Sequence, residues 1–214
     1  MNPTPLLDSW KKDLMAAQSR LDAADICHAC TVFGSARLST ASPLGRRWLP
    51  VAESLSRSLA QWMQRAHPSW VLCTGGGPGI MEAASKGAAE AGTRVLGLNV
   101  RTPWEQQPNP WISPELSLHF RDFATRKAVF FSVTRTLAVF PGGLGTLDEL
   151  FEVLTLQLTG NLPAFPVVLL DSAHWSRLLP LDYLAAHDLI DIPSNLLVTD
   201  SETEARDWLT RAQS

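Results

Sequence analysis

The residues best suited to chemistry form a glycine-rich segment in the second half of the chain, Pro141-Gly142-Gly143-Leu144-Gly145-Thr146. The segment follows an apolar run that ends at Phe140 and precedes a helical pattern, so we interpret it as a turn from a strand into a helix. Free backbone amides at the start of a helix favour an anion such as a phosphate, and the Thr146 hydroxyl can cap that helix. The segment therefore predicts an anion-binding turn.

Glu149 stands three residues after Thr146, and this position has two interpretations. The spacing is that of a capping box, in which the glutamate bonds the backbone amide of Thr146. Thr146 alone would account for the cap, however, and Asp148 and Glu152 add more carboxylates than capping needs. Spacing alone does not separate a helix cap from a functional carboxylate.

A second glycine turn, Gly75-Gly76-Gly77, follows the apolar run 71–74 and is followed by Pro78 and Gly79. Glycine lets the backbone approach a ligand closely, and proline fits the first turn of a helix. The free amides favour a phosphate here too, although the motif is neither G-x-G-x-x-G nor a phosphate-binding NTPase loop. A tight strand-to-helix connection without a ligand is the alternative.

Two further segments bring donors to the ends of predicted strands. Arg126 and Lys127 fall near the start of a predicted helix, where cations oppose the helix dipole. We interpret them as residues that bind an anionic partner, with a solvated charged turn as the alternative. Ser35 and Arg37 follow Gly34 at the end of the first predicted strand and add a further pair of donors.

The elements that must position these residues alternate between short apolar runs and amphipathic stretches. This pattern predicts one α/β domain over residues 1–214, with a doubly wound, mostly parallel sheet covered by helices on both faces. Parallel strands share a carboxyl edge where ligands bind, so the glycine turns are expected to form one site. Strands are expected near 26–33, 70–74, 94–99, 117–121, 136–140, 166–170 and 196–199. Helices are expected near 6–24, 46–66, 79–91, 123–134, 146–158, 174–187 and 202–212.

Residues 1–25 are expected to hold the N-terminal helix, with no apolar core typical of a signal peptide, which predicts a cytoplasmic protein. Residues 101–115 contain four prolines and break the alternation, so we expect a loop that carries Trp104 and Trp111.

Composition and charge exclude several classes of protein. Of the 214 residues, 45% are hydrophobic and 18% are charged, as in ordinary globular domains, so disorder, collagen and coiled coil are excluded. The net charge of −3 supplies no basic surface for a nucleic-acid backbone, and no apolar run is long enough to span a membrane. We therefore expect neither a nucleic-acid polymer nor a membrane as a partner.

The three cysteines do not indicate a disulfide framework. Cys27 and Cys30 have C-x-x-C spacing, but in the strand predicted there residues three apart point to opposite faces, and no second cysteine pair completes a metal site. We expect small buried side chains at these positions, and we predict neither a metal nor a cofactor.

Both glycine turns, extended to Ala83 and to Glu149, resemble motifs of the LOG family, whose members were formerly described as lysine decarboxylase-like. The Arg126-Lys127 pair stands between the two motifs, where the family carries its own Arg-Lys. Residues 103–110 resemble a Glu-Gln-containing segment of one branch of the family. The resemblance runs from roughly residue 31 to residue 170, in the expected order.

The resemblance implies a Rossmann-like homodimer that hydrolyses the N-glycosidic bond of a nucleoside 5′-monophosphate to a free base and ribose 5-phosphate. AMP or an N6-modified AMP would be the substrate, as in cytokinin production, and the sequence does not specify the base. By resemblance, Arg126 and Glu149 form the catalytic pair. Also by resemblance, the residues that bind the substrate and its phosphate are Ser35, Gly75, Gly76, Gly77, Glu82, Lys127, Gly142, Gly143, Gly145 and Thr146.

Two other functions compete with this hypothesis. A non-catalytic protein of the same superfamily, which binds a nucleotide or carries a pterin cofactor, would hold phosphate at similar turns but would not need both Arg126 and Glu149. An amino-acid decarboxylase, as the older description has it, needs a lysine that carries pyridoxal phosphate. Lys86 and Lys127 are the candidates near glycine turns, and Lys127 is better explained as an anion-binding residue.

Overall fold

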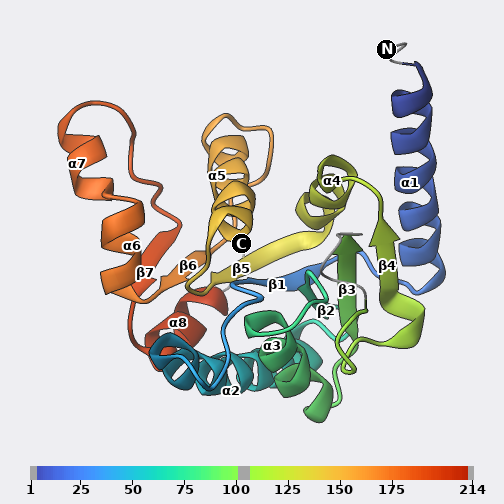
Figure 1. The fold of residues 1–214 in the computed structure, drawn as a ribbon, viewed down its shortest axis with the longest axis horizontal. Helices are drawn as coiled ribbons and strands as arrows, with labels where there is room; N and C mark the ends of the chain where they lie inside the picture. Colours follow the sequence, from blue (N-terminus) through green and yellow to red (C-terminus); the bar gives the residue numbers. More distant parts are fainter. Residues whose placement is uncertain (1–3, 101–106, 212–214) are drawn as a thin grey trace.

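The computed structural model describes residues 4–100 and 107–211, which fold around one seven-stranded sheet (Figure 1). All neighbouring strands are parallel, in the order β4-β3-β2-β1-β5-β6-β7. The strands are β1 (Ala29–Phe33), β2 (Val71–Thr74), β3 (Val95–Val100), β4 (Ser117–Phe120), β5 (Thr134–Val139), β6 (Val167–Leu170) and β7 (Leu196–Thr199). The predicted α/β fold with a parallel sheet is confirmed.

Helices cover both faces of this sheet, as Figure 1 shows. In the described part of the chain they are α1 (Thr4–Ala23), α2 (Pro43–Ala66), α3 (Ile80–Glu90), α4 (Phe123–Val133), α5 (Leu144–Leu158), α6 (Ser172–Leu178), α7 (Leu181–Ala186) and α8 (Glu202–Leu209), with a short 3₁₀ helix, η1 (Pro114–Leu116). One face carries α1, α4, α5, α6 and α7, and the other carries α2, α3 and α8. None of the described helices has the length and apolar character that a membrane span requires.

The two faces have separate apolar cores, because the inner strands are buried on both sides. Phe130 of α4, Leu150 of α5 and Trp175 of α6 belong to one core. Trp48 of α2 and Ile80 of α3 belong to the other. The apolar runs of the sequence therefore become strands that are sandwiched between helices, which holds their carboxyl ends in a rigid row.

The direction of winding reverses between β1 and β5. The chain passes from β1 outward to β4, then returns through α4 to β5 on the other side of β1. In open parallel sheets, ligands bind at the carboxyl ends of the strands on either side of such a reversal. The turns that begin at Gly34 and Pro141 follow β1 and β5, so the fold brings both to this point.

The prediction of one continuous helix over 174–187 is wrong. The segment 174–187 forms two helices, α6 and α7, which are separated at Leu179 and Pro180. Proline lacks the N–H that a continuous helix needs, and it disfavours helical backbone at the residue before it. Leu179 accordingly has φ −135° and ψ 80°, outside the helical region.

Three further expectations differ in detail. Helix α2 begins at Pro43 instead of near residue 46, because the Ser42 side chain accepts a hydrogen bond from the amide of Gly45 and caps the helix there. The loop expected over 101–115 ends in the 3₁₀ helix η1, and Trp104 lies outside the described residues. Cys30 is buried in β1, as expected, but Cys27 precedes the strand and is exposed.

Candidate active site

A pocket of about 510 Å³ opens at the carboxyl edge of the sheet, where the winding reverses. Its walls come from the turn after β1, the first turn of α4 and the first two turns of α5. Six residues of the predicted site line it: Ser35, Arg126, Gly143, Gly145, Thr146 and Glu149. Segments that are far apart in the sequence therefore meet in one pocket, as the shared strand edge predicts.

Backbone hydrogen bonds hold the walls of this pocket together. The amide of Ser35 donates to the carbonyl oxygen of Pro141 at 3.1 Å, and the amide of Ile80, at the start of α3, donates to the carbonyl oxygen of Ser35 at 3.1 Å. The turn after β1 is thus tied on one side to the turn before α5 and on the other to α3. The three glycine turns form one connected rim.

Arg126 and Glu149 form a buried pair inside this pocket. Arg126 Nη2 donates to Glu149 Oε1 at 2.5 Å, between residues that are 23 positions apart in the chain. Each residue is 8% exposed. Removal of one partner of a buried ion pair leaves the other charge buried without compensation and strongly destabilises the protein. The two residues therefore act as a unit.

The start of α5 excludes the capping-box interpretation of Glu149. The helix begins at Leu144 with Gly143 at its N-cap, and no side chain caps it. The predicted cap by Thr146 is therefore wrong, because the helix has already begun when the chain reaches that residue. Glu149 lies in the second turn, beyond the free amides of the helix start, and its carboxylate bonds Arg126.

Burial sets the protonation behaviour of Glu149. Loss of hydration raises the pKa of its carboxyl group to about 7, although the positive charge of Arg126 opposes this rise. The nearby Asp148 raises the pKa further and Lys127 lowers it. A carboxyl group that changes charge near neutral pH is suited to general acid–base chemistry.

Arg126 keeps one donor free. Its Nε is buried and has no hydrogen-bond partner among residues 4–100 and 107–211. Its guanidinium lies 4.9 Å from the ring of Phe123 and 5.6 Å from the ring of Phe130, which holds the group in position through cation–π contacts. A buried donor without a partner costs free energy.

The beginning of α5 is open toward a ligand. Gly143, Leu144 and Gly145 are exposed, and a Cβ added at either glycine would meet nothing within 4 Å. The first amides of an α-helix have no partner within the helix, and the helix dipole adds positive potential there. Thr146 is buried beside these amides. This helix start can hold a phosphate group.

Gly142 has a different role from its two glycine neighbours. A Cβ at this position would lie 2.1 Å from Oγ1 of Thr146, so no larger residue fits. Its amide donates to Nε2 of His174 at 3.4 Å instead of facing the pocket. Gly142 shapes the turn, and His174 on α6 is a neighbour that the sequence pattern did not indicate.

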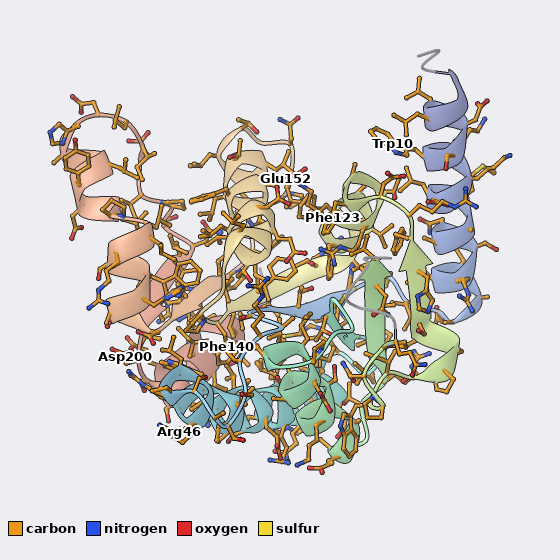
Figure 2. All side chains as sticks on the ribbon, viewed as in Figure 1. Trp10, Arg46, Phe123, Phe140, Glu152 and Asp200 are labelled. Carbon is orange, nitrogen blue, oxygen red and sulfur yellow. The ribbon has the colours of Figure 1, made fainter. Side chains whose placement is uncertain are left out.

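Lys127 pairs with carboxylates of its own chain. Its Nζ lies 3.0 Å from Asp148 Oδ1 and also contacts Glu152 Oε2. Figure 2 shows Glu152 on the side of α5 that faces α4. Carboxylates of α5 are therefore anionic partners of the two cations near the start of α4. Lys127 does not line the pocket.

The Gly75–Gly77 turn lies behind the catalytic candidates. A Cβ at Gly75 would lie 2.8 Å from Sδ of Met81 and 3.6 Å from Nη1 of Arg126. Gly76 has φ +76°, and a Cβ there would lie 2.4 Å from Oδ1 of Asn99. The positive φ and the close approach of Asn99 require a glycine at position 76, and the turn lies next to Arg126.

Glu82 lies outside the pocket that holds the pair. It lines a neighbouring groove of about 890 Å³ between α2 and α3, which shares Ala36 and Arg37 with the first pocket. Met81, one residue earlier, does line the first pocket, as does Phe123. Neither of these was singled out in the sequence, because a single apolar residue at a helix start carries no recognisable pattern.

The chain matches one known protein family and several curated proteins. The family described as "Possible lysine decarboxylase" matches residues 81–198. The pyrimidine/purine nucleotide 5′-monophosphate nucleosidase of Escherichia coli (strain K12) is 31% identical over 131 residues, which cover 55% of this chain and 28% of that protein. The protein of the same description from Escherichia coli O157:H7 matches to the same extent. The chain thus spans well under half the length of these curated relatives.

Solved structures share the fold. The crystal structure of TM1055 superposes with a TM-score of 0.61 at 23% identity, over 83% of this chain and 95% of that one. The molybdenum cofactor binding protein of Rippkaea orientalis gives 0.54 at 22% identity, over 82% and 91%. The molybdenum cofactor carrier protein of Chlamydomonas reinhardtii gives 0.54 at 21% identity, over 84% and 93%. At these identities the similarity establishes the Rossmann-like architecture alone.

Proposed function

Because the chain belongs to the family described as "Possible lysine decarboxylase", the LOG-type family that its glycine motifs resemble, we propose that it hydrolyses the N-glycosidic bond of a nucleoside 5′-monophosphate. The curated relatives are nucleotide 5′-monophosphate nucleosidases, which supports a nucleosidase. One observation carries the proposal: the buried Arg126–Glu149 pair shares a pocket with the open N-terminus of α5. AMP or an N6-modified AMP is the proposed substrate.

In this proposal the 5′-phosphate binds at the start of α5. The amides of Gly143, Gly145 and Thr146 donate to its oxygens, and the helix dipole stabilises its charge. Ser35 lines the same pocket, and its hydroxyl oxygen already accepts the Arg37 amide at 3.1 Å. The hydroxyl proton of Ser35 is therefore directed to another acceptor, which the phosphate provides.

The ribose then lies beside the Arg126–Glu149 pair. Cleavage of the C1′–N bond builds positive charge on the ribose ring, as in glycoside hydrolysis. Glu149 as a carboxylate takes a proton from a water molecule while the oxygen of that water bonds to C1′. The electron pair of the C1′–N bond leaves with the base, which takes up a proton from solvent, and Glu149 then releases the proton that it accepted to solvent. Arg126 orients the carboxylate and donates to ribose hydroxyl groups.

We propose supporting roles for Lys127, Glu82 and the Gly75–Gly77 turn. Lys127 links α4 to α5 through Asp148 and Glu152, and so keeps Arg126 and Glu149 on facing helices. Glu82 acts from the neighbouring groove. The glycine turn bounds the site behind Arg126.

We also propose a homodimer, as the resemblance implies, in the cytoplasm, where nucleoside monophosphates are produced and consumed. Large apolar side chains exposed on α1, α4 and α5, which cover the same face of the sheet (Figure 1), support an interface with a second copy. Leu7 is 58%, Phe123 48% and Phe151 41% exposed. Sedimentation equilibrium tests the assembly: the wild type should be a dimer that Phe151→Glu weakens, and a monomeric wild type contradicts it.

A substrate panel tests the proposed activity. Purified protein is incubated with AMP, GMP, CMP and N6-isopentenyl-AMP, and chromatography measures the free base and ribose 5-phosphate. Glu149→Gln should lose release by at least about 100-fold while still binding the nucleotide, because it keeps the shape but loses the base. Glu90→Gln is the matched control. Glu90, at the end of α3, also pairs with an arginine, Arg57 of α2, at 2.5 Å, but this pair is exposed.

The outcomes separate the competing functions. Undiminished release by Glu149→Gln would remove Glu149 from the mechanism. Binding of the nucleotides by the wild type without release of any base would favour a non-catalytic carrier of the same superfamily.

A further inference from the structure

Asn109, in the segment between β3 and β4, is tied to the Gly75–Gly77 turn by several hydrogen bonds. Its side-chain Nδ2 donates to the carbonyl oxygen of Gly77 at 3.0 Å, to that of Gly76 at 3.2 Å, and to Oγ of Ser85 at 3.4 Å. Its backbone amide donates to the carbonyl oxygen of Gly76 at 2.7 Å. Asn109 is only 7% exposed, so these bonds are shielded from water.

The other side of the same turn is held by Thr74 and Ser85. The amide of Gly76 donates to Oγ1 of Thr74 at 3.1 Å, and that oxygen lies 3.3 Å from Oγ of Ser85. Thr74 and Ser85 are both fully buried. Asn109 therefore closes a buried network around the turn, and networks of this kind restrict a backbone to one geometry.

The held turn lies next to Arg126. A Cβ added at Gly75 would make an ordinary van der Waals contact with Nη1 of Arg126, at 3.6 Å, so one further atom would fill the space between the turn and the guanidinium. The same guanidinium donates through Nη2 to Glu149. A shift of the turn would therefore change the space into which the guanidinium fits.

We infer that Asn109 is a positioning residue, which sets the geometry of the Arg126–Glu149 pair by fixing the Gly75–Gly77 turn behind it. Asn109 itself does not line the pocket, so it acts through the turn and does not touch the substrate. Its effect on the pair follows from the packing, while its effect on catalysis rests on the proposed function.

Loss of the Asn109 donors has a predictable direction. If the turn relaxes, Arg126 holds the Glu149 carboxylate less well, and because Arg126 lowers the pKa of Glu149, that pKa rises further. The reaction slows because misplacement of a reacting group by about 1 Å can cost up to about 100-fold in rate. The phosphate site on α5 is a separate contact, so KM should change less than kcat.

Two variants and one control test this inference. Asn109→Asp keeps the shape and the acceptor that bonds the amide of Trp111 at 3.2 Å, but loses the donors; Asn109→Ala removes both. Asn195→Ala is the matched control, because Nδ2 of Asn195 also makes two hydrogen bonds, at 2.9 Å and 2.6 Å, beside β7 and away from the pocket. The titration midpoint of the Glu149 carboxyl is measured by ¹³C NMR, with kcat and KM measured in parallel.

Both Asn109 variants should raise the titration midpoint of Glu149 by about one pH unit, because Arg126 stabilises the carboxylate less well. Both should also lower kcat about tenfold or more. The control should leave both quantities as in the wild type. A wild-type midpoint together with a wild-type kcat in the folded Asn109 variants would overturn the inference. If neither variant folds, Ser85→Ala, which removes one partner of Asn109, should shift the midpoint in the same direction by a smaller amount, and no shift would overturn it.

The NMR titration does not depend on turnover. A shifted midpoint in a protein that releases no base from any nucleotide would contradict the proposed function and leave the inference standing. Turnover in the wild type, together with Asn109 variants whose midpoint and kcat both equal those of the wild type, would support the proposed function and overturn the inference.

Discussion

The backbone amide of Ser35 donates to the carbonyl oxygen of Pro141 at 3.1 Å, and this hydrogen bond joins the turns that follow β1 and β5. It spans the point where the direction of winding reverses. The pocket forms around this junction, with Glu149 on the helix that follows the second turn and Arg126 on the helix that precedes β5.

Replacement of Arg126 should damage the site more than the loss of one surface charge would. Arg126→Ala leaves the buried Glu149 without its 2.5 Å partner, so the pKa of Glu149 rises and kcat falls by about 100- to 1000-fold. Arg126→Lys should recover only part of the activity, because an ammonium group lacks the forked donors of a guanidinium. Steady-state kinetics on both variants measures this. Arg57→Ala, which removes an arginine of the exposed pairs on α2, is the control, and equal losses in both positions would contradict the assignment.

The pH profile of the reaction should follow Glu149. Its pKa is raised by burial to about 7, and the proposed base is the deprotonated form, so kcat/KM should rise with pH to a plateau above a midpoint near 7. In Glu149→Asp any residual activity should show a displaced midpoint. A wild-type profile that is flat between pH 5 and pH 8 would exclude this carboxylate as the base.

The contribution of Glu149 to the free energy of unfolding should fall as pH rises, whereas kcat/KM should rise. A carboxyl group whose pKa is higher in the folded protein than in the unfolded chain, where it is 4.5, binds more protons when folded. Its contribution to the free energy of unfolding is therefore lost as pH rises from about 4.5 to about 7. Relative to the wild type, Glu149→Gln should gain about 2 kcal/mol between pH 5 and pH 8. Urea unfolding at the two pH values measures this, and an unchanged difference would contradict the raised pKa.

Gly142 should tolerate no side chain. A Cβ at this position would lie 2.1 Å from Oγ1 of Thr146, so Gly142→Ala should lower the free energy of unfolding by about 1–3 kcal/mol and raise KM by displacing the turn. For stability alone, Gly145→Ala is the control, because nothing lies within 4 Å of a Cβ there and alanine favours the helix. Denaturant titration distinguishes the two, and similar stabilities would show that the turn yields easily.

The native protein should contain one reactive thiol. Burial raises the pKa of Cys30 to about 12 and raises that of Cys73 well above its usual value, whereas Cys27 is exposed. Because the thiolate is the reactive form, a thiol reagent should modify one cysteine in the folded protein and all three after unfolding. Cys27→Ser should abolish the native reaction, and rapid modification that persists in this variant would show that a core strand opens.

The amino-acid sequence by itself predicted the architecture and the location of the candidate site. Apolar runs of strand length that alternate with amphipathic stretches indicate a parallel sheet covered on both faces, because such a sheet buries its strands on both sides. Glycines after three of these runs mark strand ends where the backbone turns tightly. Glu149 follows one of these glycine turns, and Arg126 follows the end of another predicted strand. These signals are local, so a short window of sequence is enough to detect them.

The tertiary structure alone decided how the candidate residues are used. Glu149 had the spacing of a helix cap, but the start of α5 at Leu144 and the approach of α4 turn it into the partner of Arg126. The same approach gives Lys127 two carboxylates, while Glu82 on α3 lines a different groove, between α2 and α3. Asn109 reaches its turn across more than thirty residues. Strand order and helix packing set these contacts, and neither is encoded within the few residues that a motif spans.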